Sequence, residues 1–128
     1  MLKKWIPAEK PEKEELKERL KEAERKLEQY QLQMKERKLP VLVLVEGWGS
    51  AGKGSIIGKV IRNIDPRFFR VATMGEPTAE EKRRPFMYRY VAQIPQEGKF
   101  EFLDSGWMDE IVRERFTGEL DEEDYAKR

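Results

Sequence analysis

A glycine-rich loop with a single lysine is the segment best equipped for chemistry, and it reads GWGSAGK over residues 47–53. Gly47, Gly52 and Lys53 fit the spacing G-x-x-x-x-G-K, the core of a phosphate-binding loop. Glycines there permit positive φ angles and close backbone approach, so that consecutive amides point at phosphate oxygens. The lysine adds a charge that follows a transferring phosphoryl group. We predict a phosphate-binding loop; the alternative is a tight turn that matches the pattern by coincidence.

The residue after the lysine departs from the usual loop. A serine or threonine there normally places its hydroxyl on Mg²⁺, and Gly54 has no side chain to do so. Ser55 either substitutes from one position further on or simply lies in the first helical turn. The predicted phosphate-binding residues are Gly47, Gly49, Ser50, Ala51, Gly52, Lys53, Gly54 and Ser55.

The segments on either side of the loop have the patterns that such a loop requires. Residues 41–45 are a continuous run of valine and leucine, typical of a strand buried on both faces of a parallel sheet. Apolar residues then recur at helical spacing between Ile56 and Ile64. The loop is therefore expected between a strand and a helix, where the helix N-terminus favours anions.

Later segments continue the alternation of strands and helices. A helix is predicted from Thr78 to about Gln93, with Thr78 and Glu81 as its capping box. This alternation predicts an α/β layer fold with a parallel sheet of about three strands. The other predicted elements are strands at 68–73 and 100–104 and short helices at about 108–117 and 121–127.

Residues 11–38 contain no glycine and many strong helix formers, which predicts one long helix. Pro11 suits the first helical position, and Pro40 ends the segment. The helix either lies across its own domain or makes a coiled-coil contact with a second copy of the chain. We accordingly divide the chain into a helix at 1–39 and a domain at 40–128. The narrow apolar stripe of the predicted helix consists of Leu16, Leu20, Ala23, Leu27, Tyr30 and Met34.

The composition excludes several kinds of chemistry. With no cysteine and no histidine, the chain has no disulfide, no thiolate metal site and no imidazole base. The 26 basic and 25 acidic side chains give a net charge of +1, which indicates neither a nucleic-acid nor a membrane partner. The start MLKKWIPAEK lacks the apolar core of a signal peptide, and no run reaches membrane-spanning length, so we expect a cytoplasmic chain.

Several separated blocks resemble the type-2 polyphosphate kinases, which include polyphosphate:AMP phosphotransferases. The resemblance implies a P-loop kinase fold, Mg²⁺ as cofactor, and inorganic polyphosphate with AMP or ADP as substrates. A glycine after the lysine is common in that family. The blocks are EGWGSAGKGSII (46–57), IDPRFFRV (64–71), EPTAEEKRRPFMYRYVAQIPQEGKF (76–100) and FLDSGWM (102–108).

The same resemblance implies catalytic roles for Lys53, Asp104 and Arg89. Asp104 matches the family's acidic residue at the end of the strand beside the loop, where it would hold Mg²⁺; the alternative is a helix N-cap. Arg89 matches an arginine in the segment before the P-x-x-G turn, where a cation would meet phosphate. A basic run also follows the predicted capping box, and it either lines a polyanion path or forms a solvated face. This run consists of Lys82, Arg83 and Arg84.

Two departures from the family pattern affect the expected activity. Gly49 replaces the aspartate of the family's G-W-D, and DSGWM replaces D-R-S-W-Y, so that Ser105 stands in place of an arginine. The family domain also continues, with a lid, beyond the length of this chain. Two hypotheses follow: a domain that transfers phosphoryl groups between polyphosphate and AMP or ADP, or a non-catalytic remnant that binds phosphate or oligomerises through its helix.

Overall fold

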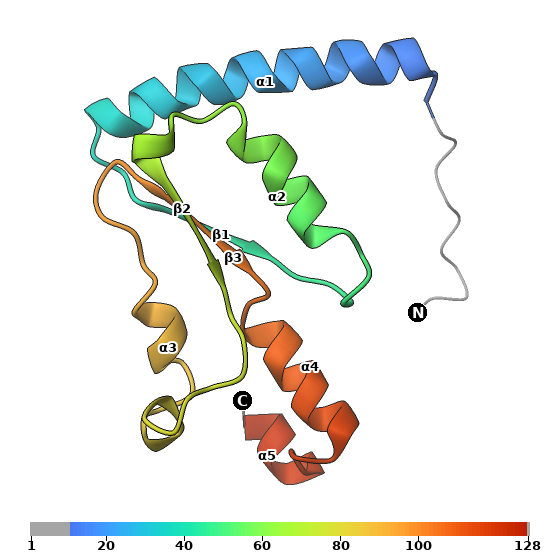
Figure 1. Cartoon of the computed structure of the whole chain (residues 1–128), viewed down its shortest axis with the longest axis vertical. Helices are drawn as coiled ribbons and strands as arrows, with labels where there is room; N and C mark the ends of the chain where they lie inside the picture. The colour runs from blue at the N-terminus through green and yellow to red at the C-terminus, as the bar shows by residue number, and fades with distance from the viewer. Residues whose placement is uncertain (1–10, 128) are drawn as a thin grey trace.

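Three parallel strands lie at the centre of the structure, a computed structural model that describes residues 11–127. They are β1 (Val41–Val45), β2 (Phe69–Thr73) and β3 (Phe100–Asp104), in the order β1-β3-β2 (Figure 1). β1 and β3 have the predicted bounds, and the prediction of a three-stranded parallel sheet is confirmed. The signal-peptide prediction rests on residues 1–10, which lie outside the described residues.

The buried strand of the sheet is β3. All five residues of β1 are half-buried because β1 forms an edge of the sheet, so the prediction of a strand buried on both faces is wrong for residues 41–45. In β3 every residue from Phe100 to Leu103 is buried, and Leu103 is fully inaccessible. β3 lies between the two edge strands, so it is the strand that is buried, as the sequence pattern had predicted for β1.

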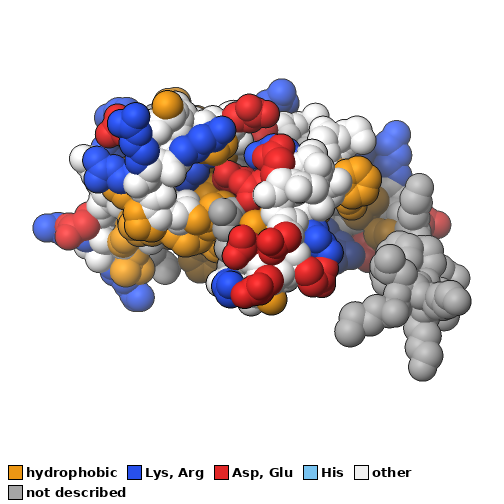
Figure 2. All heavy atoms as spheres, turned by 90° about the horizontal axis from the view of Figure 1, so that it is seen from below, with side chains coloured by type: hydrophobic (Ala, Val, Ile, Leu, Met, Phe, Trp, Pro, Cys, Tyr) orange, Lys and Arg blue, Asp and Glu red, His pale blue; other side chains and the backbone are white. Residues whose placement is uncertain are grey.

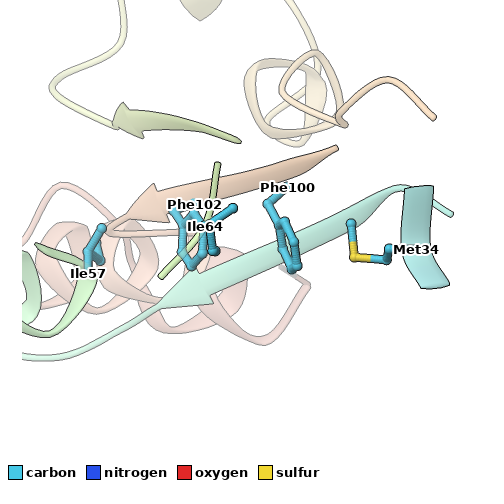
Figure 3. Close-up of a cluster of buried hydrophobic side chains, with 5 residues drawn as sticks. All are labelled: Met34, Ile57, Ile64, Phe100 and Phe102. Carbon is cyan, nitrogen blue, oxygen red and sulfur yellow. The ribbon is translucent and has the colours of Figure 1, made fainter. Parts of the chain in front are cut away.

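Side chains from two helices and the sheet form the main hydrophobic core. α1 (Lys13–Glu36) supplies Met34, and α2 (Lys53–Ile61) supplies Ile57. Figure 3 shows these two side chains at opposite ends of a row that follows the sheet. The core therefore fixes α2, and with it the end of the glycine loop, against the central strand. The buried cluster consists of Met34, Ile57, Ile64, Phe100 and Phe102.

The long predicted helix is present as α1 and ends at a hydrogen-bonded cap. Lys38 has a φ of 54°, and the amide of Leu39 reaches the carbonyl of Met34 at 3.0 Å. These features are those of a Schellman cap, with lysine at the position that usually holds glycine. Near this end Met34 is buried in the chain's own core, whereas Leu16 and Leu20 in the first half of α1 are exposed. Only part of the stripe therefore packs within the chain.

The segment after β2 does not form the helix predicted from Thr78 to about Gln93. It contains a single 3-10 turn, η3 (Glu81–Arg83), and one turn of helix, α3 (Tyr88–Val91). Pro85 explains the break: it lacks an amide donor and disfavours helical geometry at Arg84, which is extended with ψ at 160°. The predicted capping box is nevertheless confirmed, with reciprocal bonds of 2.8 and 3.2 Å between Thr78 and Glu81.

The remaining elements lie close to their predicted positions. β2 begins one residue later than predicted because the 3-10 turn η2 (Pro66–Phe68) precedes it. α4 (Trp107–Thr117) starts where β3 leaves the sheet, and α5 (Glu122–Lys127) follows it (Figure 1). Among residues 11–127, no helix is both long and apolar enough to span a bilayer.

We predict that Leu103→Ala destabilises the fold by about 2–5 kcal/mol, because it leaves a cavity at the fully buried position of the central strand. Equilibrium urea unfolding measures this change. Leu32→Ala on α1 is the matched control, since Leu32 is 65% exposed and should change stability by less than about 0.5 kcal/mol. Equal losses for the two variants would contradict the assigned core.

Candidate functional site

The glycine loop, residues 47–53, has the backbone geometry that its sequence predicts. Gly47 has a φ of 149° and Gly52 a φ of 85°, values that side-chain-bearing residues rarely adopt. Between them the amide of Ala51 bonds to the carbonyl of Trp48 at 2.9 Å, which closes a turn. Gly52 is the N-cap of α2, so the loop opens directly onto the positive end of that helix.

Lys53 folds back over the loop. Its ammonium donates hydrogen bonds to the carbonyl oxygens of Gly47 and of Trp48, the latter at 3.4 Å. It also forms an ion pair with Asp109 at 3.3 Å between Nζ and Oδ2, and its side chain is only 11% exposed. The lysine therefore holds a fixed position across the mouth of the loop.

Asp109 is the site residue that sequence reasoning missed. It belongs to the first turn of α4, and its Oδ1 accepts a hydrogen bond of 3.0 Å from the amide of Gly47. One carboxylate thus contacts both the first amide of the loop and the ammonium of Lys53. In the sequence Asp109 looks like an ordinary acidic residue of a first helical turn, and the 62-residue separation from Gly47 gives no local signal.

Glu46, at the end of β1, fixes the start of α4. Its Oε2 accepts hydrogen bonds from the amides of Gly106 at 3.1 Å and of Asp109 at 3.2 Å. The N-cap of α4 is Gly106, which has no side chain to cap the helix, so Glu46, the residue after β1, satisfies these free amides. A Cβ at position 106 would come within 2.3 Å of Glu46 Oε1, so glycine leaves room for the carboxylate.

Asp104 ends β3 directly beside the loop. The register of the sheet pairs it with Val45, the last residue of β1. Its Oδ2 lies 3.8 Å from the point where a Cβ of Gly54 would stand, which places the carboxylate by the first turn of α2. The alternative role of Asp104 as the N-cap of α4 is wrong, because Gly106 occupies that position.

The donor set near Asp104 fits Mg²⁺ of the kind that binds with substrate phosphates. Within residues 11–127, no group of three or more acidic, histidine or cysteine side chains is arranged to hold a metal by itself. Mg²⁺ in phosphoryl-transfer sites needs only one or two carboxylates, because phosphate oxygens and water complete its octahedral coordination. Asp104 beside the loop is consistent with that arrangement.

Arg89 lies in a separate, buried cluster. The side chain is 7% exposed, and its Nη2 donates to the carbonyl of Gly75 at 2.5 Å. Its guanidinium also pairs with Glu110 at 3.4 Å and with Glu81 at 3.9 Å. Tyr90 donates to the same Glu110, and burial, followed by that carboxylate, raises the pKa of the phenol above its ordinary value. The structure thus gives Arg89 a set of carboxylate and carbonyl partners of its own.

The other predicted loop residues are open to solvent. Nothing lies within 4 Å of a Cβ built at Gly49, so the space beside this position is open. Ser55 lies in the first turn of α2 and is exposed. These positions are Gly49, Ser50, Ala51, Gly54 and Ser55.

A cavity of about 500 Å³ opens beside the loop and is mostly apolar. Its walls come from the loop and from one face of α4, where Met108, Val112 and Phe116 recur every four residues. Phe116 is 85% exposed and Trp48 is 73% exposed. Arg113 also lines this cavity, and it lines the neighbouring one that contains Gly106 and Glu110.

The basic run at 82–84 lies at another part of the surface. Arg84 pairs with Glu80 at 3.5 Å and stacks on Tyr88, with its guanidinium carbon 4.8 Å from the ring centre. Figure 2, which views the molecule from below the orientation of Figure 1, shows basic side chains gathered at the left and acidic ones nearer the centre. Arg84 is thus an exposed side chain just after a 3-10 turn, with partners of its own.

Comparison with known proteins decides the family. The family model for polyphosphate kinase 2 matches residues 10–128. The chain belongs to the polyphosphate kinase 2 family. It is 34% identical over 87 residues to a polyphosphate:AMP phosphotransferase of Pseudomonas syringae pv. tomato, an alignment that covers 68% of this chain and 18% of that protein.

Solved structures support the same assignment and show a P-loop kinase-like fold. A Pseudomonas aeruginosa PA01 protein described as polyphosphate kinase 2 superposes with a TM-score of 0.87 at 26% identity, over 98% of this chain and 28% of that one. Polyphosphate kinase 2 from Arthrobacter aurescens TC1 gives a TM-score of 0.83 at 25% identity, over 97% and 46%. The resemblance predicted from the sequence is confirmed. The chain spans less than a third of the length of the curated relatives it matches.

We predict that Glu46→Ala destabilises the protein by about 1–2 kcal/mol, because the amides of Gly106 and Asp109 lose a charged acceptor. Urea unfolding measures the loss. Glu97→Ala, in an exposed turn, is the control and should leave stability within about 0.5 kcal/mol of the parent. If Glu46→Ala behaves like this control, Glu46 does not cap α4.

Proposed function

We propose that this chain carries the phosphate-binding part of a domain that transfers phosphoryl groups between inorganic polyphosphate and AMP or ADP. The observation that supports it most is the glycine loop: two glycines with positive φ lead into α2, beside the carboxylate of Asp104 at the end of the adjacent strand. The printed names of the relatives supply the substrates. The relatives include a polyphosphate:AMP and an ADP-polyphosphate phosphotransferase.

In this proposal the loop amides and the N-terminus of α2 bind phosphate oxygens, and Lys53 balances the charge of the transferring group. Asp104 holds Mg²⁺, which when bound neutralises negative charge on the phosphates. No covalent intermediate on the protein is needed, which suits a chain without histidine or cysteine. Because the acceptors are AMP and ADP, we propose a cytoplasmic location.

Ser105 stands where the family pattern has an arginine, so the positive charge of that side chain is missing here. Ser105 itself has a φ of 72°. Arg113 lines the cavities that meet at Ser105 and Asp109, so we assign it a phosphate-neutralising role there. Arg89 is proposed to act from its buried cluster, as a positioning residue for the segment after β2. We also retain the division of the chain into an N-terminal segment at 1–39, which contains α1, and a domain at 40–128.

We predict that Lys53→Ala abolishes binding of polyphosphate, because it removes the ammonium that contacts the loop. Isothermal titration calorimetry with sodium tripolyphosphate and Mg²⁺ measures the affinity. Lys59→Ala, an exposed lysine on the same helix, is the matched control and should bind as the parent does. If Lys53→Ala binds tripolyphosphate as tightly as the parent does, residues 47–53 are not a phosphate-binding loop.

Phosphoryl transfer itself is tested by a coupled assay with polyphosphate, Mg²⁺ and AMP or ADP. Product formed by the parent and lost in Lys53→Ala supports a catalytic domain. Binding by the parent without product would support the second candidate function, a non-catalytic module that binds polyphosphate.

In this second function, α1 would bind the α1 of a second copy of the chain. Leu16 and Leu20 of the apolar stripe are 48% and 56% exposed, although they share a helix face with the buried Met34. A coiled-coil contact between two copies would cover them. Their exposure is the observation that favours assembly.

We predict that the parent chain is a dimer in solution and that the double variant Leu16→Lys/Leu20→Lys is a monomer, since charge at the seam opposes pairing. Light scattering after gel filtration gives the mass. Leu32→Lys, which alters an exposed leucine off the stripe, is the control and should stay dimeric. A parent chain that is strictly monomeric would rule out this assembly.

A further inference from the structure

The groups of the loop that would bind a phosphate already bind an anion of the chain itself. Gly47 donates its amide to Asp109 Oδ1 at 3.0 Å, and Lys53 lies 3.3 Å from Asp109 Oδ2. A backbone amide and the lysine ammonium are the two kinds of donor that such loops offer to phosphate oxygens. The carboxylate of Asp109 therefore occupies the position of a ligand.

Two helix N-termini lie close to Asp109. Asp109 lies in the first turn of α4, and Lys53, its partner, is the first residue of α2, so the carboxylate is close to the positive ends of two helices. Its Oδ2 is buried and makes no hydrogen bond within the described residues apart from the ion pair with Lys53. A buried carboxylate oxygen with so few partners depends on that one cation.

Glu46 explains why Asp109 points at the loop. Because Glu46 accepts the amides of Gly106 and Asp109, the first turn of α4 is tied to the end of β1, directly before the loop. The side chain of Asp109 then has the loop within reach in the folded protein. The contact is thus a consequence of how α4 is anchored.

We propose that Asp109 is an internal competitor for the phosphate loop, which a bound polyphosphate must displace. The inference rests on the proposed function, because it concerns the same loop. A single phosphate, with few charges, competes weakly against a tethered carboxylate at high local concentration. A polyphosphate chain brings many charges and competes well. Asp109 therefore lowers the loop's affinity for both ligands by the same factor, and polyphosphate, with more charges, still binds where a single phosphate binds weakly.

A supporting role for Asp109 predicts the opposite behaviour. If its carboxylate only held Lys53 in place for the ligand, then its removal would weaken binding. If it competes with the ligand, then its removal strengthens binding although the protein loses an ion pair. The direction of the change in affinity separates the two roles.

The test compares Asp109→Asn with the parent, using sodium tripolyphosphate and sodium phosphate as probes in isothermal titration calorimetry. We expect Asp109→Asn to bind each probe about tenfold more tightly, the factor that 1.4 kcal/mol represents. Asp124→Asn is the matched control, because it removes one carboxylate from an exposed ion pair with Lys127 on α5 and should leave affinity unchanged. Melting temperature provides a second readout: Asp109→Asn should melt at or below the parent, and a loss of folding does not produce tighter binding.

Each outcome has a separate meaning. Tighter binding by Asp109→Asn alone supports the proposal, while unchanged or weaker binding by that variant overturns it and leaves the proposed function standing. Equal gains in Asp109→Asn and Asp124→Asn overturn it as well, since they reflect net charge alone. If neither the parent nor Asp109→Asn binds either probe while both are folded, the inference and the proposed function fail together.

Discussion

The parallel pairing of β1 with β3 is the constraint on which the site depends. The register places Val45 opposite Asp104, and the amide of Ser105 still bonds to the carbonyl of Val45 at 3.1 Å, so both strands leave the sheet at the same level. The glycine loop and the start of α4 therefore lie side by side (Figure 1). Because β1 and β3 are nearly sixty residues apart in the chain, a shift of one residue in this register would separate the loop from both of its carboxylates.

The local elements of the site were predictable because their signals are local. Each of three elements could be predicted from residues next to one another in the sequence. These are the strand β1 from its valine and leucine run, the loop from its two glycines, and α2 from its apolar spacing. Strand order was not predictable in this way, which is why β1 was expected to be buried on both faces and proved to be an edge. The helix expected from Thr78 was wrong for a reason visible in the sequence, since Pro85 stands inside it. Glu46 and Asp109 could not be found, because their contacts exist only once the strands pair.

The near balance of basic and acidic residues in the sequence does not show which of them are paired with one another in the fold. Arg70 reaches Glu101, a buried residue of the central strand, at 2.7 Å, and Arg89 pairs with the buried Glu110. Such pairs offset the cost of burying carboxylates and contribute little attraction for an external anion. Net charge was accordingly no guide to a polyanionic ligand. What bears on the ligand is the small group of charges at the loop, where one ammonium faces a carboxylate from another helix.

The position of Trp48 has an optical consequence. Trp48 is 73% exposed on the loop, and its backbone carbonyl accepts a hydrogen bond from Lys53, so its indole belongs to the segment that contacts the lysine. Trp107 instead is half-buried and packs edge-on against the buried Tyr90, with ring centres 5.9 Å apart. Quenching by iodide separates the emission of an accessible indole from that of a shielded one. In a Trp5→Phe variant, which removes the third tryptophan of the sequence, Trp48 would thus be a fluorescent label for the state of the loop, with Trp107 on α4 as an internal reference.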